Sequence, residues 1–188
     1  MDYINGRNEI VKILKKNLKG EKFEHSLGVE KTALELAKRY GEDVNKAGLA
    51  GLLHDITKQM DNVALAEHYG IKSLVEKTLH GHTGAQFLLE NGYVGQDDVL
   101  NAIRFHTTGR KEMSLLEKII YIADYIEPQR AFDGVEKLRK IAFENIDKAV
   151  LLGLMMAINS IIENKSLIDV DSVEAYNFYR KMFEGEEI

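Results

Sequence analysis

The sequence predicts an all-α protein, a single-domain bundle of helices joined by short loops, and two observations carry this prediction. The first is composition, because the 188 residues include one proline, Pro128, and many of the helix-forming residues Ala, Leu, Glu and Lys. The second is periodicity, which is clearest in the segment 115–124. There Leu116, Ile119, Ile120 and Ala123 recur at the i, i+3, i+4, i+7 spacing of one helix face. No segment requires a strand.

Glycines at plausible helix ends divide the chain into helices; Gly41 and Gly70 are examples. A chain of this length fits one domain. We expect a core over about 20–130, with C-terminal helices over about 133–183 packing on it, and we see no linker, repeat or low-complexity tract. Taken in order, the predicted helices cover about 6–18, 24–40, 43–56, 61–68, 73–79, 81–91, 97–105, 114–126, 133–142, 145–163 and 171–183.

Composition excludes several classes of function. A formal net charge of −5 and a pI near 5.7 argue against duplex nucleic acid as the main partner. The absence of cysteine excludes disulfides, thiolate nucleophiles and zinc–thiolate sites. The N-terminal segment 1–22 lacks the apolar run of a signal peptide, and no stretch approaches the roughly 18 apolar residues of a membrane span. We therefore expect a cytoplasmic protein with no membrane partner.

Imidazoles and carboxylates recur along the chain in an order that suits a hydrolytic site with one or two metal ions. The adjacent pair His-Asp follows an apolar run, and further groups lie upstream and downstream. Mixed imidazole and carboxylate ligands favour a transition metal such as iron, manganese, zinc, cobalt or nickel, whereas an all-oxygen set would indicate magnesium or calcium. The ordered set is His25, His54, Asp55, His80, His106 and Asp124.

Helical phase supports an inward position for several of these groups. His25 shares a face with Val29 and Leu36, so its ring should point into the core. Asp124 continues the buried stripe at i+8, where a carboxylate is costly unless it is paired or bound to metal. Asp55 is the natural bridge between two ions because a carboxylate offers two oxygens.

For the remaining histidines, helical phase indicates less clearly which side chains point toward the proposed metal site. His80 and His82 stand at i and i+2, which do not share a helix face, so one of the two is expected to reach the metals. His106 begins a polar run after a predicted helix, in the segment 105–110. His68 is expected to face solvent at a helix end and to have no role.

With these residues in place, the chain resembles the HD-domain metal-dependent phosphohydrolases. Within that superfamily it closely resembles the YqeK-type symmetrical bis(5′-nucleosyl)-tetraphosphatases. The most specific runs are His-Thr-Thr-Gly-Arg and Ala-Asp-Tyr-Ile-Glu-Pro. The matching segments are His25-Ser26, 54–58, Leu79-His80-Gly81 with Gly84-Ala85, 106–110, 123–128 and Arg130.

The resemblance implies a set of roles. It implies one or two divalent ions, iron first, with manganese, cobalt or nickel as possible substitutes, held by His25, His54, Asp55 and Asp124. His80 and His106 fall where two-metal relatives bind a second ion and where the family contacts phosphates. Lys58 joins Asp55, His80 and His106 as a catalytic residue. Substrate contacts are implied for His25, Asp55, Lys58, His80, His106, Thr107, Arg110, Asp124, Arg130 and Asn177.

Two positions depart from the family pattern. Proline is frequent in relatives where this chain has His82, which could supply an extra ligand or stand on the surface. Where relatives carry Glu-Ala-Arg-Asn, this chain has Tyr176 in place of the arginine, although Asn177 could still contact substrate.

The activity implied is cleavage of a small dinucleoside tetraphosphate, such as diadenosine tetraphosphate, into two nucleoside diphosphates (ADP). A homodimer is possible. One alternative is a non-catalytic nucleotide- or metal-sensing HD module, although no ligand residue is missing. Another is a different HD nucleotide phosphohydrolase, such as a deoxynucleotide phosphohydrolase or a cyclic-nucleotide phosphodiesterase, against which the His-Thr-Thr-Gly-Arg loop weighs.

Overall fold

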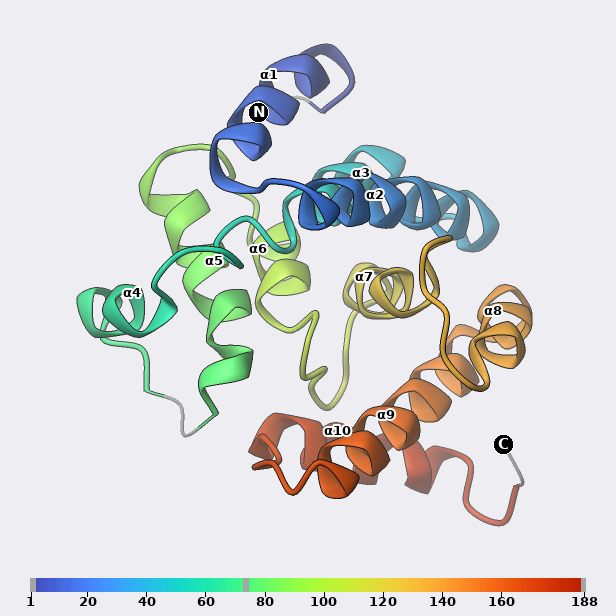
Figure 1. Cartoon of the computed structure of the whole chain (residues 1–188). Coiled ribbons are helices and arrows are strands. Elements are labelled where there is room, and N and C mark those ends of the chain that lie inside the picture. Colours follow the sequence, from blue (N-terminus) through green and yellow to red (C-terminus); the bar gives the residue numbers. More distant parts are fainter. Residues whose placement is uncertain (1–2, 73–74, 187–188) are drawn as a thin grey trace.

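The computed structural model describes residues 3–72 and 75–186, and within these ranges every regular element is a helix (Figure 1). The predicted all-α class is confirmed. The elements are α1 (Tyr3–Asn17), α2 (Glu21–Tyr40), α3 (Val44–Leu53), α4 (Asn62–Tyr69), the 3-10 helix η1 (Glu76–Thr78), α5 (Leu79–Glu90), α6 (Asp97–Arg104), α7 (Leu115–Ile126), α8 (Val135–Glu144), α9 (Ile146–Glu163) and α10 (Val170–Met182).

Helix α7 lies at the centre of the bundle and packs against α2, α3, α6, α8 and α9 (Figure 1). Its apolar stripe is fully inside, since Ile119, Ile120 and Ala123 are all 0% exposed. The helix begins with a capping box, in which Ser114 and Glu117 each accept a hydrogen bond from the other's backbone N–H. The central position of α7 places its last turn, which carries Asp124, beside the start of α2.

Several predicted boundaries differ from the structure, and two of the differences lie next to residues of the predicted site. The helix predicted over 43–56 ends at Leu53, because the chain continues in tight turns whose N–H groups bond the carbonyl three residues earlier, as Lys58 does with Asp55. The separate helix predicted over 73–79 is confirmed only in part, since among its described positions 76–78 form the 3-10 helix η1 and Leu79 begins α5. Val75 is extended, with φ −115° and ψ 95°, so the chain enters η1 and α5 only after it. Residues 73–74 lie outside the described ranges.

The N-terminal helix α1 is hydrogen-bonded to a buried carboxylate of α2. Glu30 accepts a 2.5 Å hydrogen bond from the Tyr3 hydroxyl and two 2.6 Å bonds from the Arg7 guanidinium. The Tyr3 ring lies directly on Gly48 of α3, where an added Cβ would come within 2.3 Å of it. Tyr3 therefore links α1 to both α2 and α3, through its hydroxyl and its ring.

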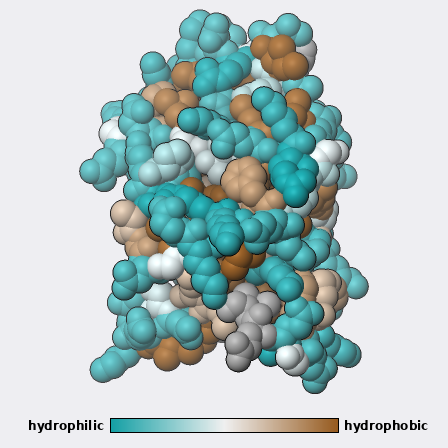
Figure 2. All heavy atoms as spheres, turned by 90° about the vertical axis from the view of Figure 1, so that its right-hand side faces the viewer, coloured by the Kyte–Doolittle hydropathy of each residue, from teal (hydrophilic) through white to brown (hydrophobic). Residues whose placement is uncertain are grey.

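Figure 2 shows one face of the molecule, on which hydrophilic residues predominate and hydrophobic ones are scattered. Among the described residues, no helix is long and apolar enough to cross a membrane.

We expect Glu30→Gln to lower the free energy of unfolding by about 1–3 kcal/mol, because the substitution removes the charge that the Tyr3 hydroxyl and Arg7 share. Urea denaturation followed by circular dichroism measures this. The matched control is Glu9→Gln, which loses only an exposed pair with Lys12 and should change stability by about 0.5 kcal/mol or less. Equal effects of the two substitutions would contradict the role of Glu30.

Candidate metal centre

Three histidines are oriented by the same type of local hydrogen bond, from the ring to the backbone. In each, Nδ1 donates to the carbonyl oxygen of the residue three positions earlier, at 2.8, 3.0 and 2.7 Å. Because a carbonyl can only accept, Nδ1 carries the proton and Nε2 presents a lone pair. The pairs are His54 with Gly51, His80 with Lys77, and His106 with Ile103.

The Nε2 atoms of these rings converge on one carboxylate. Asp55 Oδ1 lies 3.2 Å from His80 Nε2 and 3.3 Å from His106 Nε2, and Oδ2 lies 3.7 Å from His54 Nε2. The rings form a row, with centroids 5.3 Å apart for His25–His54, 4.9 Å for His54–His106 and 5.0 Å for His106–His80. Asp55 therefore lies within 3.7 Å of the Nε2 atoms of three imidazoles.

Among residues 3–72 and 75–186, three overlapping groups have one ligand atom per residue, all within 4.8 Å of one another. Asp55 belongs to two of them, which gives two candidate ion positions with a common carboxylate. Asp124 completes the first, through its group with His54 and His106. The groups are His25, His54 and Asp55; His54, His106 and Asp124; and Asp55, His80 and His106.

Two buried atoms of this cluster test whether a metal fits. Within the part of the chain that the structure describes, His54 Nε2 and Asp55 Oδ1 have no hydrogen-bond partner, although their residues are 0% and 3% exposed. A buried acceptor without a partner is costly, and a cation between them would satisfy both. The Nε2 lone pairs of His80 and His106 also face each other at 3.1 Å. The cluster can hold a divalent metal ion, and its mixed nitrogen and oxygen donors suit a transition metal.

The electrostatics keep two of the donors, His54 and Asp124, in the form that binds metal. Burial lowers the pKa of the His54 imidazole to about 4, so this ring is neutral near pH 7. Burial alone would raise the pKa of Asp124, but the hydrogen bond with His25 and the neighbouring Arg130 guanidinium hold it well below its usual value. A neutral imidazole and an ionised carboxylate are the ligand forms.

Glu127 completes the surroundings of His25 and was not among the predicted site residues. Its Oε1 lies 3.1 Å from His25 Nδ1, and His25 Nε2 lies 3.0 Å from Asp124 Oδ1, so the ring is held between two carboxylates. Glu127 is 2% exposed, and a Cβ at Gly28 would come within 2.6 Å of its carboxylate. The i+3 spacing from Asp124 is the signal that could have identified it.

Three further predicted residues lie at the edge of the cluster. Lys58 Nζ donates to His80 Nε2 at 2.9 Å and lies 3.6 Å from Asp55 Oδ1. The Thr107 hydroxyl is 3.0 Å from His106 Nε2 and 3.1 Å from His80 Nε2. Arg130 donates to Asp124 Oδ1 at 2.5 Å and to the Asp124 carbonyl at 2.8 Å.

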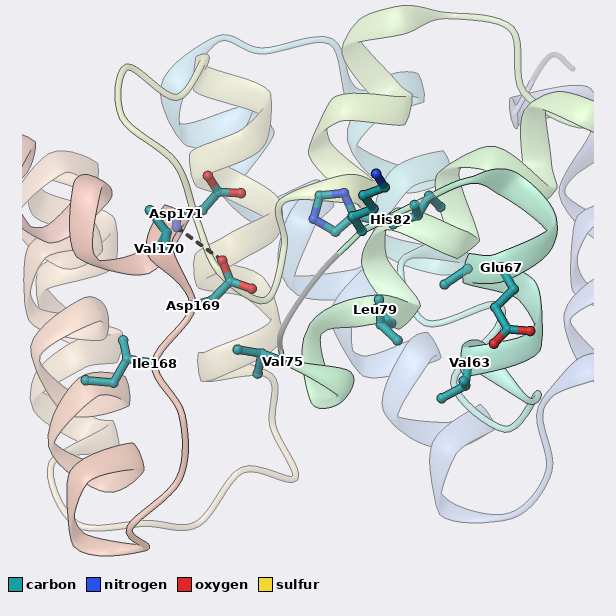
Figure 3. A pocket seen from close by; sticks show the side chains of 12 residues that line it. Val63, Glu67, Val75, Leu79, His82, Ile168, Asp169, Val170 and Asp171 are labelled. Carbon is teal, nitrogen blue, oxygen red and sulfur yellow. Dashed lines mark hydrogen bonds between the residues drawn. The ribbon is translucent and has the colours of Figure 1, made fainter.

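Other predicted residues are not brought into the cluster. Arg110 forms a bidentate pair with the buried Glu117, at 2.7 and 2.9 Å. Asn177 is exposed on α10 and has no hydrogen bond with a described residue. His82 stacks edge-on against Phe105, with centroids 5.7 Å apart, and lines a separate pocket between α4, α5 and the start of α10 (Figure 3). His68 is exposed on α4.

Comparison with known proteins identifies the family. The HD-domain profile matches residues 23–129. A symmetrical bis(5′-nucleosyl)-tetraphosphatase of Halalkalibacterium halodurans is 39% identical over 91% of this chain and 95% of its own length. This chain belongs to the HD-domain family.

Two further HD-domain relatives support the same family assignment. The Bacillus subtilis protein of the same name is 35% identical over 92% of this chain and 96% of its own length. A crystal structure from Clostridium acetobutylicum, described as a predicted HD superfamily hydrolase involved in NAD metabolism, superposes with a TM-score of 0.88 and 41% identity. It covers 94% of this chain and 97% of its own. Within the HD family, the chain therefore belongs with the symmetrical bis(5′-nucleosyl)-tetraphosphatases, and the resemblance read from its motifs is confirmed.

We expect Glu127→Gln to weaken metal binding by about 10- to 100-fold, because a carboxylate that orients a ligating imidazole also raises its basicity. Elemental analysis after dialysis against graded chelator concentrations measures the loss. Glu144→Gln, an exposed change of the same type on α8, is the control and should retain the wild-type metal content. Full metal retention in Glu127→Gln would exclude the orienting role.

Proposed function

We propose that this HD-domain protein is a metal-dependent phosphoanhydride hydrolase that cleaves dinucleoside tetraphosphates symmetrically into two nucleoside diphosphates. The observation that carries the proposal is the buried carboxylate of Asp55, shared between two groups of candidate ligands and left without a hydrogen bond on Oδ1. Relatives that align over nearly the whole chain, and are named for this reaction, support the choice of substrate.

Two sets of residues would hold the ions. His25, His54, Asp55 and Asp124 would form the first site, and Asp55 with His80 and His106 the second. Iron is the proposed ion, with manganese, cobalt or nickel able to replace it, because imidazole and carboxylate donors accept all four. When bound, such ions lower the pKa of a water molecule and neutralise the charge on phosphoryl oxygens.

The side chains around the cluster would position the tetraphosphate. Lys58 supplies an ammonium group at the His80 end of the ring row, and Thr107 a hydroxyl between His80 and His106. Arg130 lies at the opposite end, beside Asp124, with 40% of its side chain exposed. Cations on both sides fix which phosphorus lies over the cluster, and that register sets the products.

Arg130 is the arginine that the geometry favours for phosphate binding. Arg110 would have to leave the buried Glu117, which also caps α7, before it could reach substrate. We therefore expect Arg130→Gln to raise the KM for the tetraphosphate by about 10- to 100-fold.

The proposed partner is a small nucleotide rather than nucleic acid, and the homodimer and the cytoplasmic location remain predictions.

The product distribution tests the function. Purified protein incubated with diadenosine tetraphosphate and iron, manganese, cobalt or nickel should release ADP as the only nucleotide, which chromatography of early time points resolves. Equal amounts of AMP and ATP would contradict symmetrical cleavage. No hydrolysis with any of the four metals would favour a non-catalytic sensing module.

The metal assignment has its own test. Asp55→Asn should lose both ions and at least about 100-fold in turnover, because one neutral amide replaces the anion that both sites share. Elemental analysis reports the metal independently of activity. Asp61→Asn, at the exposed N-cap of α4, controls for the loss of a carboxylate nearby. Full metal content in Asp55→Asn would refute the shared site.

A further inference from the structure

A groove of about 890 Å³ opens from the cluster between α4, η1 and the turn that joins α9 to α10. Its inner end is formed by Lys58 and His80, both of which contact Asp55. Its outer wall includes Lys77 and Lys165, which come from elements far apart in the sequence. The groove is therefore continuous with the proposed catalytic centre and leaves it on the side away from Arg130.

Two of the three lysines in this groove lack a partner. The side chains of Lys77 and Lys165 are exposed and form no ion pair or hydrogen bond with any residue in the described ranges. The groove also contains two carboxylates, of which Asp61 is engaged in capping α4 through the Ala64 N–H. Glu76 is exposed. Unpaired ammonium groups next to a phosphate-cleaving centre suit an anionic ligand.

The backbone at Lys165 gives an independent reason to regard its side chain as functional. Lys165 follows α9 with φ +52°, in the left-handed region where glycine or asparagine is usual after a helix. Its N–H bonds the Ile162 carbonyl and that of Ser166 bonds Ile161, so the turn itself needs only backbone. At this positive φ the backbone conformation is less favourable for lysine than for glycine. The Lys165 side chain lines the groove.

We propose that this groove binds the phosphates of the nucleotide half that leaves, with Lys77 and Lys165 as its binding cations. The inference rests on the proposed function and adds a second nucleotide subsite to it. Arg130 lies beside the first half of the substrate, and Lys58 lies at the junction, where negative charge develops on the leaving phosphate. The leaving nucleoside diphosphate then extends past η1 toward the α9–α10 turn.

Steady-state kinetics with diadenosine tetraphosphate test the subsite. Lys77→Gln and Lys165→Gly should each raise KM by about three- to tenfold with little change in kcat, because exposed charge-assisted contacts are lost and the cluster is intact. Lys165→Gly should also unfold at an equal or higher temperature than wild type, since glycine adopts positive φ freely. Glu76→Gln should lower KM.

The matched control is Lys140→Gln, which removes one exposed lysine from α8, at the other end of the molecule from α4 (Figure 1). A KM for Lys77→Gln and Lys165→Gly within twofold of wild type would overturn the proposal. So would an equal rise in Lys140→Gln, because that result would indicate only the net charge of the protein.

Calorimetric binding of diadenosine tetraphosphate separates this proposal from the catalytic one. If the wild type produces no ADP, the proposed function fails, but weaker binding by Lys165→Gly than by Lys140→Gln would still support the groove. If the wild type binds no dinucleotide, the subsite is overturned as well.

Discussion

The structure depends on one costly arrangement, the burial of a carboxylate among imidazole lone pairs. Asp55 is 3% exposed, and its Oδ1 faces the Nε2 atoms of His80 and His106, which have no proton to donate. Such a group destabilises the fold unless a cation satisfies it. The apolar core around the cluster contributes the stability that offsets this cost. Because metal binding would remove the unfavourable arrangement, it would stabilise the fold.

Three of the four clustered histidines are held by backbone rather than by other side chains, which helps ligands from five different segments to meet. Each of His54, His80 and His106 is fixed by the carbonyl three residues earlier, so the ring orientation follows from the local helical turn. His25 has no such bond and depends on Glu127 instead. Movement of the turn after α7 would therefore disturb His25 first.

Helical phase and residue order were sufficient to predict the all-α fold, and they also predicted the residues of the cluster. They failed where two segments had to be placed relative to each other. Glu127 was missed because its importance depends on a 3.1 Å distance to a residue about a hundred positions earlier. The motif that suggested a phosphate contact for Arg110 also did not reveal its ion pair with Glu117. The helix predicted over 73–79 missed the extended Val75, after which 76–78 form η1 and Leu79 begins α5.

The candidate site is asymmetric although the proposed substrate has two identical halves. One end of the ring row has a guanidinium fixed to Asp124, and the other has the Lys58 ammonium at the mouth of a lysine-lined groove. A planar, paired Arg130 suits a phosphate that must stay in register during attack. Mobile, strongly hydrated lysines suit a diphosphate that must depart. The two ends could therefore treat chemically identical halves differently, and this difference would let a central bond be cut while one half is held.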